Sequence, residues 1–157
     1  MNALLVYPKF PDTYWSFRYA LSFQGKRAAQ PPLGLMTVAA LLPASWNKRL
    51  IDTNVERLRD SDLAWADVVL LSGMHVQQEH LISIVRRCRA LSIRTVVGGP
   101  IASSIAATKL GADHVVIGEA ETSSPISPAT SKPAPLAPFT NPPSVPPWIT
   151  PPCPISA

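Results

Sequence analysis

The sequence predicts an α/β domain with a doubly wound, five-stranded parallel sheet, and three observations support this fold class. Short apolar runs alternate with stretches of helical periodicity between residues 3 and 117. The strongest runs are continuously apolar, which is typical of strands covered on both faces. Proline or glycine follows several of them, where each strand has to turn toward a helix.

The first elements are bounded by prolines. A strand is expected at 3–7 (Ala-Leu-Leu-Val-Tyr), and Pro8 ends it. Prolines at 31–32 open a helix, since proline is favoured in a first helical turn, and Pro43 closes it. A short second strand follows at 49–52.

The middle of the chain contains the most apolar strand and the clearest helix. A brief helix near 61–65 leads into the third strand at 67–72. The helix after it has apolar residues at i, i+3, i+4 and i+7. These residues are Leu81, Ile84, Val85 and Cys88.

Two further strands complete the expected sheet, one at 95–97 and one at 114–117. The helix between them is marked by Ile105, Ala106 and Leu110, and Gly111 follows where a left-handed residue often ends a helix. Helical crossovers imply parallel strands and right-handed connections, so the expected strand order is 2-1-3-4-5.

In such a sheet, ligands bind beyond the carboxyl ends of the strands, at the switch point between strands 1 and 3. Topology therefore selects four loops, which are 8–32, 72–76, 98–101 and 118–121. The first is far longer than usual and holds six of the chain's 11 aromatic residues. It is interpreted as a lid or a docking surface, or else as a segment that packs on its own helix.

Composition separates a folded part from a tail. Residues 122–157 hold 12 of the 18 prolines and one charged residue, Lys132, which predicts disordered or polyproline-II-like chain. Residues 1–121 carry a net charge of +3 with scattered basic residues, which does not indicate a nucleic-acid surface. The start of the chain lacks the pattern of a signal peptide and no run is long enough to span a membrane, so the cytoplasm is the expected location.

Two strand ends carry small or polar residues that suit either a ligand or a tight turn. Ser72-Gly73-Met74 follows the third strand, and Gly98-Gly99 follows the fourth. A backbone without Cβ atoms lets a planar ligand approach closely, but many strand–helix turns also use glycine. The two motifs are more informative together than apart.

Several stretches at strand ends and helix starts share one pattern. They are 7–11 (Tyr-Pro-Lys-Phe-Pro), 14–17, 25–26, 31–43, 50–55, 64–67, 97–100 and 118–121. The pattern resembles the B12-binding domain at the amino terminus of many radical SAM enzymes, in the subgroup that includes hopanoid C-2 methylases. The stretch 31–43 is its most specific part, and the resemblance covers nearly all of residues 1–121.

The resemblance implies cobalamin as the cofactor, held by residues of the selected loops. The candidate cofactor-binding residues are Pro32, Gly34, Asp52, Asn54, Ser72, Gly73, Met74, Gly98, Gly99, Gly118 and Glu119. Related domains of methionine synthase and the mutases give cobalt a histidine from the first loop, but residues 8–32 contain none. His75 is interpreted as a loop residue or edge contact, and His80 and His114 as structural.

The chain is not expected to be a complete radical SAM enzyme. That chemistry needs a Cys-x3-Cys-x2-Cys motif for a [4Fe–4S] cluster, and the only cysteines are Cys88 and Cys153. The cluster and S-adenosylmethionine would belong to a missing domain, which is normally part of the same chain. No catalytic residue and no protein metal ligand is therefore assigned.

The tail leaves three interpretations open, which are a Pro-rich ligand, a flexible end without function, and a frameshift product. The frameshift is favoured because codons for Pro, Ser, Ala and Thr share one second base. A shifted frame over 125–141 also permits a charged, helix-forming sequence. Alternative functions are a flavodoxin-like or receiver-like binding or scaffold domain, and a non-functional gene fragment. A receiver is disfavoured because strand 3 ends in Leu71-Ser72-Gly73 without a phosphoacceptor Asp.

Overall fold

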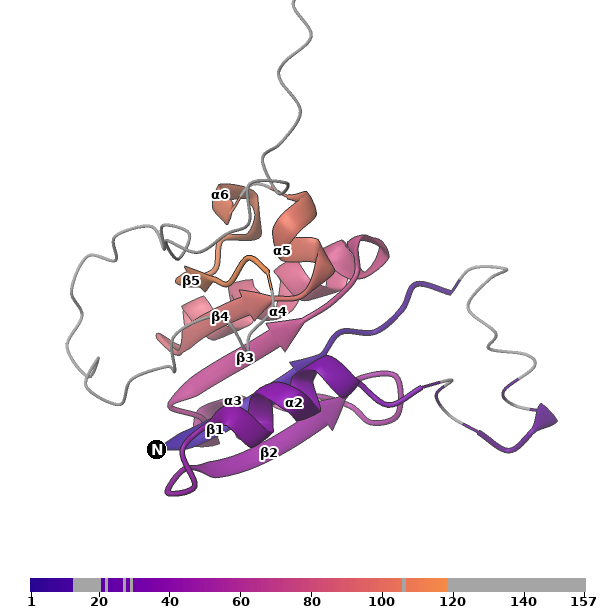
Figure 1. Cartoon of the computed structure of the whole chain (residues 1–157), viewed down its shortest axis with the longest axis horizontal. Coiled ribbons are helices and arrows are strands. Elements are labelled where there is room, and N and C mark those ends of the chain that lie inside the picture. The colour runs from indigo at the N-terminus through magenta and orange to yellow at the C-terminus, as the bar shows by residue number, and fades with distance from the viewer. Residues whose placement is uncertain (13–20, 22, 27, 29, 106, 119–157) are drawn as a thin grey trace, which may run out of the picture.

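A single parallel sheet organises the chain (Figure 1). The computed structural model describes residues 1–12, 21, 23–26, 28, 30–105 and 107–118. The sheet has five strands in the order β2-β1-β3-β4-β5, which confirms the predicted fold class and topology. The strands are β1 (Asn2–Tyr7), β2 (Asn47–Asp52), β3 (Val68–Ser72), β4 (Arg94–Gly98) and β5 (His114–Val115).

Helices connect the strands as crossovers. They are α2 (Leu33–Leu41), α3 (Asp60–Trp65), α4 (Gln78–Ala90), α5 (Pro100–Ser104) and α6 (Ala107–Leu110). A short 3-10 helix, His75–Gln77, leads directly into α4. The tail from residue 122 and much of the aromatic loop, including 13–20, lie outside the described residues, as do Ala106 and Glu119.

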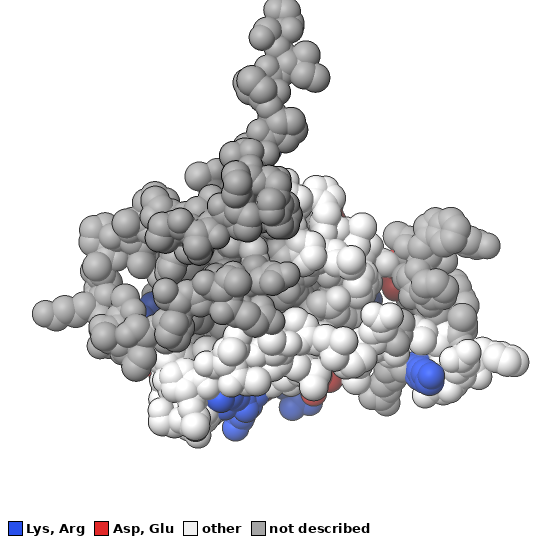
Figure 2. Space-filling view, in the orientation of Figure 1, with Lys and Arg blue, Asp and Glu red and all other residues white. Residues whose placement is uncertain are grey.

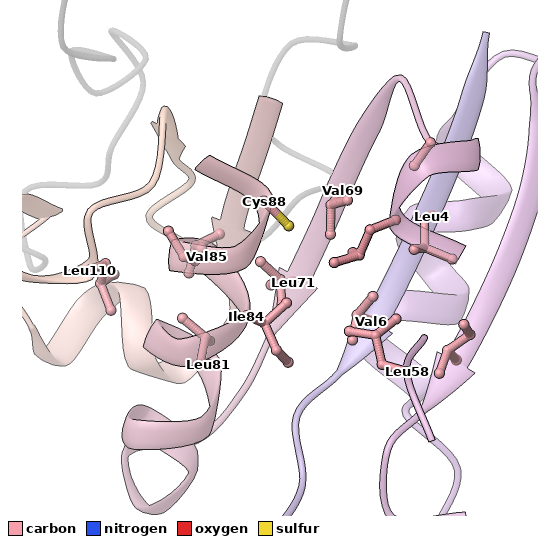
Figure 3. Packing of buried hydrophobic residues seen from close by; sticks show 14 of the residues in the cluster. Leu4, Val6, Leu58, Val69, Leu71, Leu81, Ile84, Val85, Cys88 and Leu110 are labelled. Carbon is pink, nitrogen blue, oxygen red and sulfur yellow. The ribbon is translucent and has the colours of Figure 1, made fainter. Parts of the chain in front are cut away.

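Alternate side chains of the sheet enter two separate cores. Ala3 and Leu5 of β1 pack with Leu35 of α2 on one face. Leu4 and Val6 enter the larger core on the other face, with α3, α4 and α6 (Figure 3). The period-2 alternation of a strand therefore places helices on both sides, as expected for a doubly wound sheet.

Helix α4 is the main cover of the larger core. Its predicted apolar stripe of Leu81, Ile84, Val85 and Cys88 is buried in the larger core (Figure 3). Burial raises the pKa of the Cys88 thiol to about 11. The thiol therefore stays protonated near neutral pH and acts as a small apolar group.

The helical region before β5 differs from its prediction. Ile105 was expected to be helical, but it is extended (φ −128°, ψ 137°) and ends α5. The helix starts earlier, at Pro100, because proline is favoured at the first helical position and because Ile101 and Ala102 supply its buried side. Gly111 has φ +66°, so the predicted left-handed residue after the second short helix is confirmed.

Candidate functional site

The strand ends that topology selected lie along one edge of the sheet. Tyr7 pairs with Asp52 at the ends of β1 and β2, and Ser72 pairs with Gly98 at the ends of β3 and β4. The helix α2 starts at the same edge, because a right-handed crossover runs antiparallel to its strands. Pro32, which is buried, and Gly34, which is exposed, therefore join the candidate residues there.

The residues at the ends of β3 and β4 pack closely against one another. Gly99 has φ +79° and ψ −172°, and a Cβ built on it would collide with Ser72 Oγ. The Gly73 carbonyl also accepts a hydrogen bond from the Ile101 N–H at 3.0 Å. The glycine at 99 is thus required by the protein's own packing and by a backbone conformation essentially restricted to glycine.

Two other candidate glycines have room for a Cβ. The closest atoms to a Cβ on Gly98 belong to Val116, at 3.8 Å, which is ordinary contact. Gly118 has φ +93°, is exposed, and would place a Cβ with no atom within 4 Å. At both positions bare backbone is accessible to a ligand.

Of the remaining candidates, some are hydrogen-bonded within the protein and one is exposed. Asp52 Oδ1 accepts hydrogen bonds from the backbone N–H and the side-chain amide of Asn54, at 2.9 and 2.7 Å. Asn54 Oδ1 accepts one from the Phe10 N–H at 2.9 Å. The two polar candidates after β2 are therefore engaged in holding the start of the loop after β1, while Met74 is half exposed.

Gln77 is the residue that the sequence analysis missed. Its side chain is buried, with an exposed fraction of 1%. Its amide nitrogen donates to the Pro8 carbonyl, and its amide oxygen accepts from the Met74 N–H at 2.8 Å. One side chain thus joins the loop after β1 to the loop after β3, at the switch point of the sheet.

His80 holds the same loop from α4. Its Nδ1 accepts a hydrogen bond from the Lys9 N–H at 2.7 Å, so the imidazole has to be neutral at this nitrogen. Burial, followed by the charges of Lys9 and Arg87, lowers the pKa of His80 below its ordinary 6.5. The predicted structural role of His80 is confirmed, since it accepts a hydrogen bond from Lys9 in the loop after β1.

Tyr7 lies beside these contacts at the end of β1. Its ring packs edge-on against Phe10, with centroids 5.9 Å apart. Burial raises the pKa of the Tyr7 hydroxyl, a hydrogen bond with Gln77 opposes this shift, and the Asp52 carboxylate adds to it. The phenol therefore stays protonated near neutral pH.

The remaining histidines and the acidic residues are possible metal ligands within the part of the chain that the structure describes. No cluster of three or more His, Cys, Asp or Glu side chains occurs among those residues. His75 is exposed in the 3-10 helix, and His114 lies in β5. None of the described helices is long and apolar enough to cross a bilayer.

The fold and this edge define a doubly wound domain, a class in which ligands bind at the carboxyl ends of the strands. Comparison with protein families matches residues 27–126 to the B12 binding domain. The chain therefore belongs to the B12-binding domain family, as its sequence motifs indicated.

Two curated relatives share this stretch. An uncharacterised methyltransferase of Synechocystis sp. is 39% identical over 128 residues, which cover 80% of this chain and 24% of that protein. Hopanoid C-2 methylase of Rhodopseudomonas palustris is 33% identical over 117 residues, 74% of this chain and 22% of that protein. The chain thus spans about a quarter of the length of each. No solved structure matches significantly.

The two neighbouring glycines give a matched pair for mutation. Gly99→Ala is expected to destabilise the fold by about 1–3 kcal/mol, because its backbone angles suit only glycine and its Cβ would collide with Ser72 Oγ. Gly98→Ala has room for its Cβ and is expected to cost well under about 1 kcal/mol. Urea unfolding of both variants checks this, and equal losses would contradict it.

The His80 contact predicts a pH dependence. Because the pKa of His80 is lower in the folded than in the unfolded chain, its contribution to stability is present above pH 6.5 and is lost as the pH falls through the folded pKa. The loss is expected to stay under about 1 kcal/mol, since the ring is partly solvated.

Urea unfolding and amide exchange of Lys9 at pH 7.5 and 5.5 measure this effect. Exchange rates are corrected for the intrinsic effect of pH. His80→Ala is expected to remove the dependence of the Lys9 amide, whereas His75→Ala, at an exposed position, is expected to retain it. A pH response that survives in His80→Ala argues against the assignment.

Proposed function

We propose that this chain is the cobalamin-binding module of a radical SAM methylase-like protein. The observation that carries the proposal is the pair Ser72 and Gly98, side by side at the ends of β3 and β4. A hydroxyl group and backbone without a side chain lie together at the carboxyl edge of the sheet, in a domain of the B12-binding family. Ligands of doubly wound sheets bind at this edge.

The face of the sheet that carries α2 is the proposed side of approach. Ser72 and Gly98 alternate with residues of the larger core and so point to the α2 face, as does half-buried Val96. Among the described residues, α2 is the helix that contributes to the core on this face, and it packs over β1 and β3. The β4 side of the same face is therefore open to a large cofactor, as far as the described residues show.

Residues that fit the cofactor follow from this geometry. Gly98 and Gly118 offer bare backbone, and Ser72 offers a hydroxyl group. Pro32, Gly34 and Met74 stand at the same edge, whereas Asp52, Asn54, Gly73 and Gly99 shape the loops. Bound cobalamin would supply a transferable methyl group, and its cobalt would receive no histidine from residues 8–32, which contain none.

The proposed partner is a radical SAM domain that carries the iron–sulfur cluster and S-adenosylmethionine. Each curated relative is about four times as long as the stretch it shares with this chain. The outer side of α2 fits such a partner, because Leu33, Met36 and Leu41 are about half exposed or more on a helix without charged residues. Figure 2 shows that the surface over α2 is uncharged, with both basic and acidic side chains at its margin. The cytoplasm remains the proposed location.

Reconstitution tests cobalamin binding. The purified chain, incubated with hydroxocobalamin and desalted, is expected to stay red. Gly98→Leu is expected to weaken binding at least about tenfold, because it fills the accessible backbone with a side chain. Ala90→Leu introduces the same side chain at an exposed position of α4 and serves as the control. A colourless wild-type eluate at saturating ligand contradicts the proposal and favours a scaffold domain or a non-functional fragment.

Sequencing the gene tests whether it also encodes the proposed radical SAM domain. If residues beyond about 121 arise from a frameshift, another frame downstream is expected to encode Cys-x3-Cys-x2-Cys after a helix-forming stretch. A downstream sequence without this motif in any frame argues for a natural tail or linker.

A further inference from the structure

We propose that Gln77 is a positioning residue for the cofactor site, which locks the loop after β1 to the loop after β3 without being a cofactor ligand itself. The proposal rests on the proposed function for its cofactor, but the lock itself is a property of the folded chain. Its basis is the pair of hydrogen bonds that one buried amide makes to two backbone groups of different loops.

The lock joins segments that are far apart in sequence. The Gln77 amide nitrogen donates to the carbonyl of Pro8, which is 69 residues away, and the amide oxygen accepts from the Met74 N–H three residues back. The Pro8 carbonyl follows the last residue of β1, and Met74 lies two residues beyond β3. Because these strands are neighbours, the contact spans the switch point.

Only a side chain with both a donor and an acceptor at this length satisfies the two groups. Ionised glutamate keeps the acceptor and loses the donor, while methionine has a similar length and provides neither in useful strength. Without the Gln77 amide, the Pro8 carbonyl would keep only a 3.4 Å hydrogen bond from Asn54 Nδ2 and the Met74 N–H would lose its side-chain acceptor, so the loops would rearrange to regain water or another partner. The side chain thus determines where the loop backbone lies.

Gly73 is explained by the same lock. A Cβ on Gly73 would lie 3.3 Å from the Gln77 amide oxygen, 3.5 Å from Leu81 and 3.6 Å from Pro8. The missing side chain leaves the space into which the amide fits. The glycine at 73 therefore leaves room for the Gln77 contact between the two loops. That contact in turn positions Ser72, the candidate ligand residue directly before Gly73.

Two further contacts fix the direction in which the locked loop leaves the sheet. The Lys9 N–H donates to His80, and the Phe10 N–H donates to Asn54 on the opposite side. Three consecutive residues are thus held from the β2 side and the β3 side before the aromatic loop continues. Of the three side chains that hold these residues, Gln77 is the most deeply buried, so it restricts the position of the loop most.

Two substitutions at Gln77 separate its donor from its acceptor. Gln77→Glu is expected to keep the Met74 amide protected from hydrogen exchange, because it retains the acceptor, and Gln77→Met is expected to expose it. Both are expected to weaken hydroxocobalamin binding at least about tenfold in absorbance titrations, because the Pro8 carbonyl keeps only the longer hydrogen bond from Asn54 Nδ2, at 3.4 Å. The matched controls are Gln78→Glu and Gln78→Met at the adjacent, half-buried position, with affinity within twofold of wild type.

A stabilising osmolyte distinguishes positioning from simple loss of stability. Trimethylamine oxide raises the stability of the fold without restoring a specific hydrogen bond. The weakened affinity of Gln77→Met is expected to persist when the osmolyte returns its unfolding midpoint to the wild-type value. Recovery of full affinity under those conditions overturns the proposal, as does wild-type affinity in both Gln77 variants.

The two proposals fail in different ways. A wild-type chain that binds no cobalamin contradicts the proposed function and the role of Gln77 in cofactor affinity, whatever the variants do. The lock is then decided by exchange alone. Faster exchange of the Met74 amide in Gln77→Met but not in Gln78→Met supports it, and unchanged exchange in both overturns it.

Discussion

The burial of β1 between two layers is the constraint on which the rest of the structure depends. Ala3, Leu4, Leu5 and Val6 are each at most 1% exposed, and their side chains alternate between the two cores. Each larger side chain contributes about 1.5–3 kcal/mol of burial, and strands β2 and β3 occupy both hydrogen-bonding edges. The chain therefore leaves the sheet at Pro8 with little freedom, and its last carbonyl groups need partners from other loops.

Those partners link four of the loops at the carboxyl edge into one unit. Thr53 donates through its N–H and its hydroxyl to the Tyr7 carbonyl, and Gln77 donates to the next carbonyl. The Gly73 carbonyl then accepts from Ile101 at the start of α5. The loops after β2, β1, β3 and β4 are thus hydrogen-bonded in the order of the strands. No side-chain nitrogen or oxygen that is buried among the described residues lacks a partner.

Periodicity was sufficient to predict the fold, because each strand and the α4 stripe are local patterns whose buried faces the sequence displays. The edge contacts were not predictable in the same way. Gln77 and His80 reach partners 69 and 71 residues away, and a lone Gln or His carries no local signal of such a contact. Ile105 misled for a related reason, since an apolar residue at the end of a short helix packs on the core without being helical.

The structure also separates the glycines that the sequence could only group together. Gly73 and Gly99 lack side chains because Gln77 and Ser72 fill the space that a Cβ would need. At Gly98 and Gly118 a Cβ would meet no such neighbour. Packing among the described residues therefore does not require a glycine at either position. A glycine pair after a strand can thus combine two physical roles, with one residue shaping the turn and the other left accessible. At this edge the member with room for a Cβ, Gly98, is paired with Ser72, and these two residues form the proposed contact with a ligand.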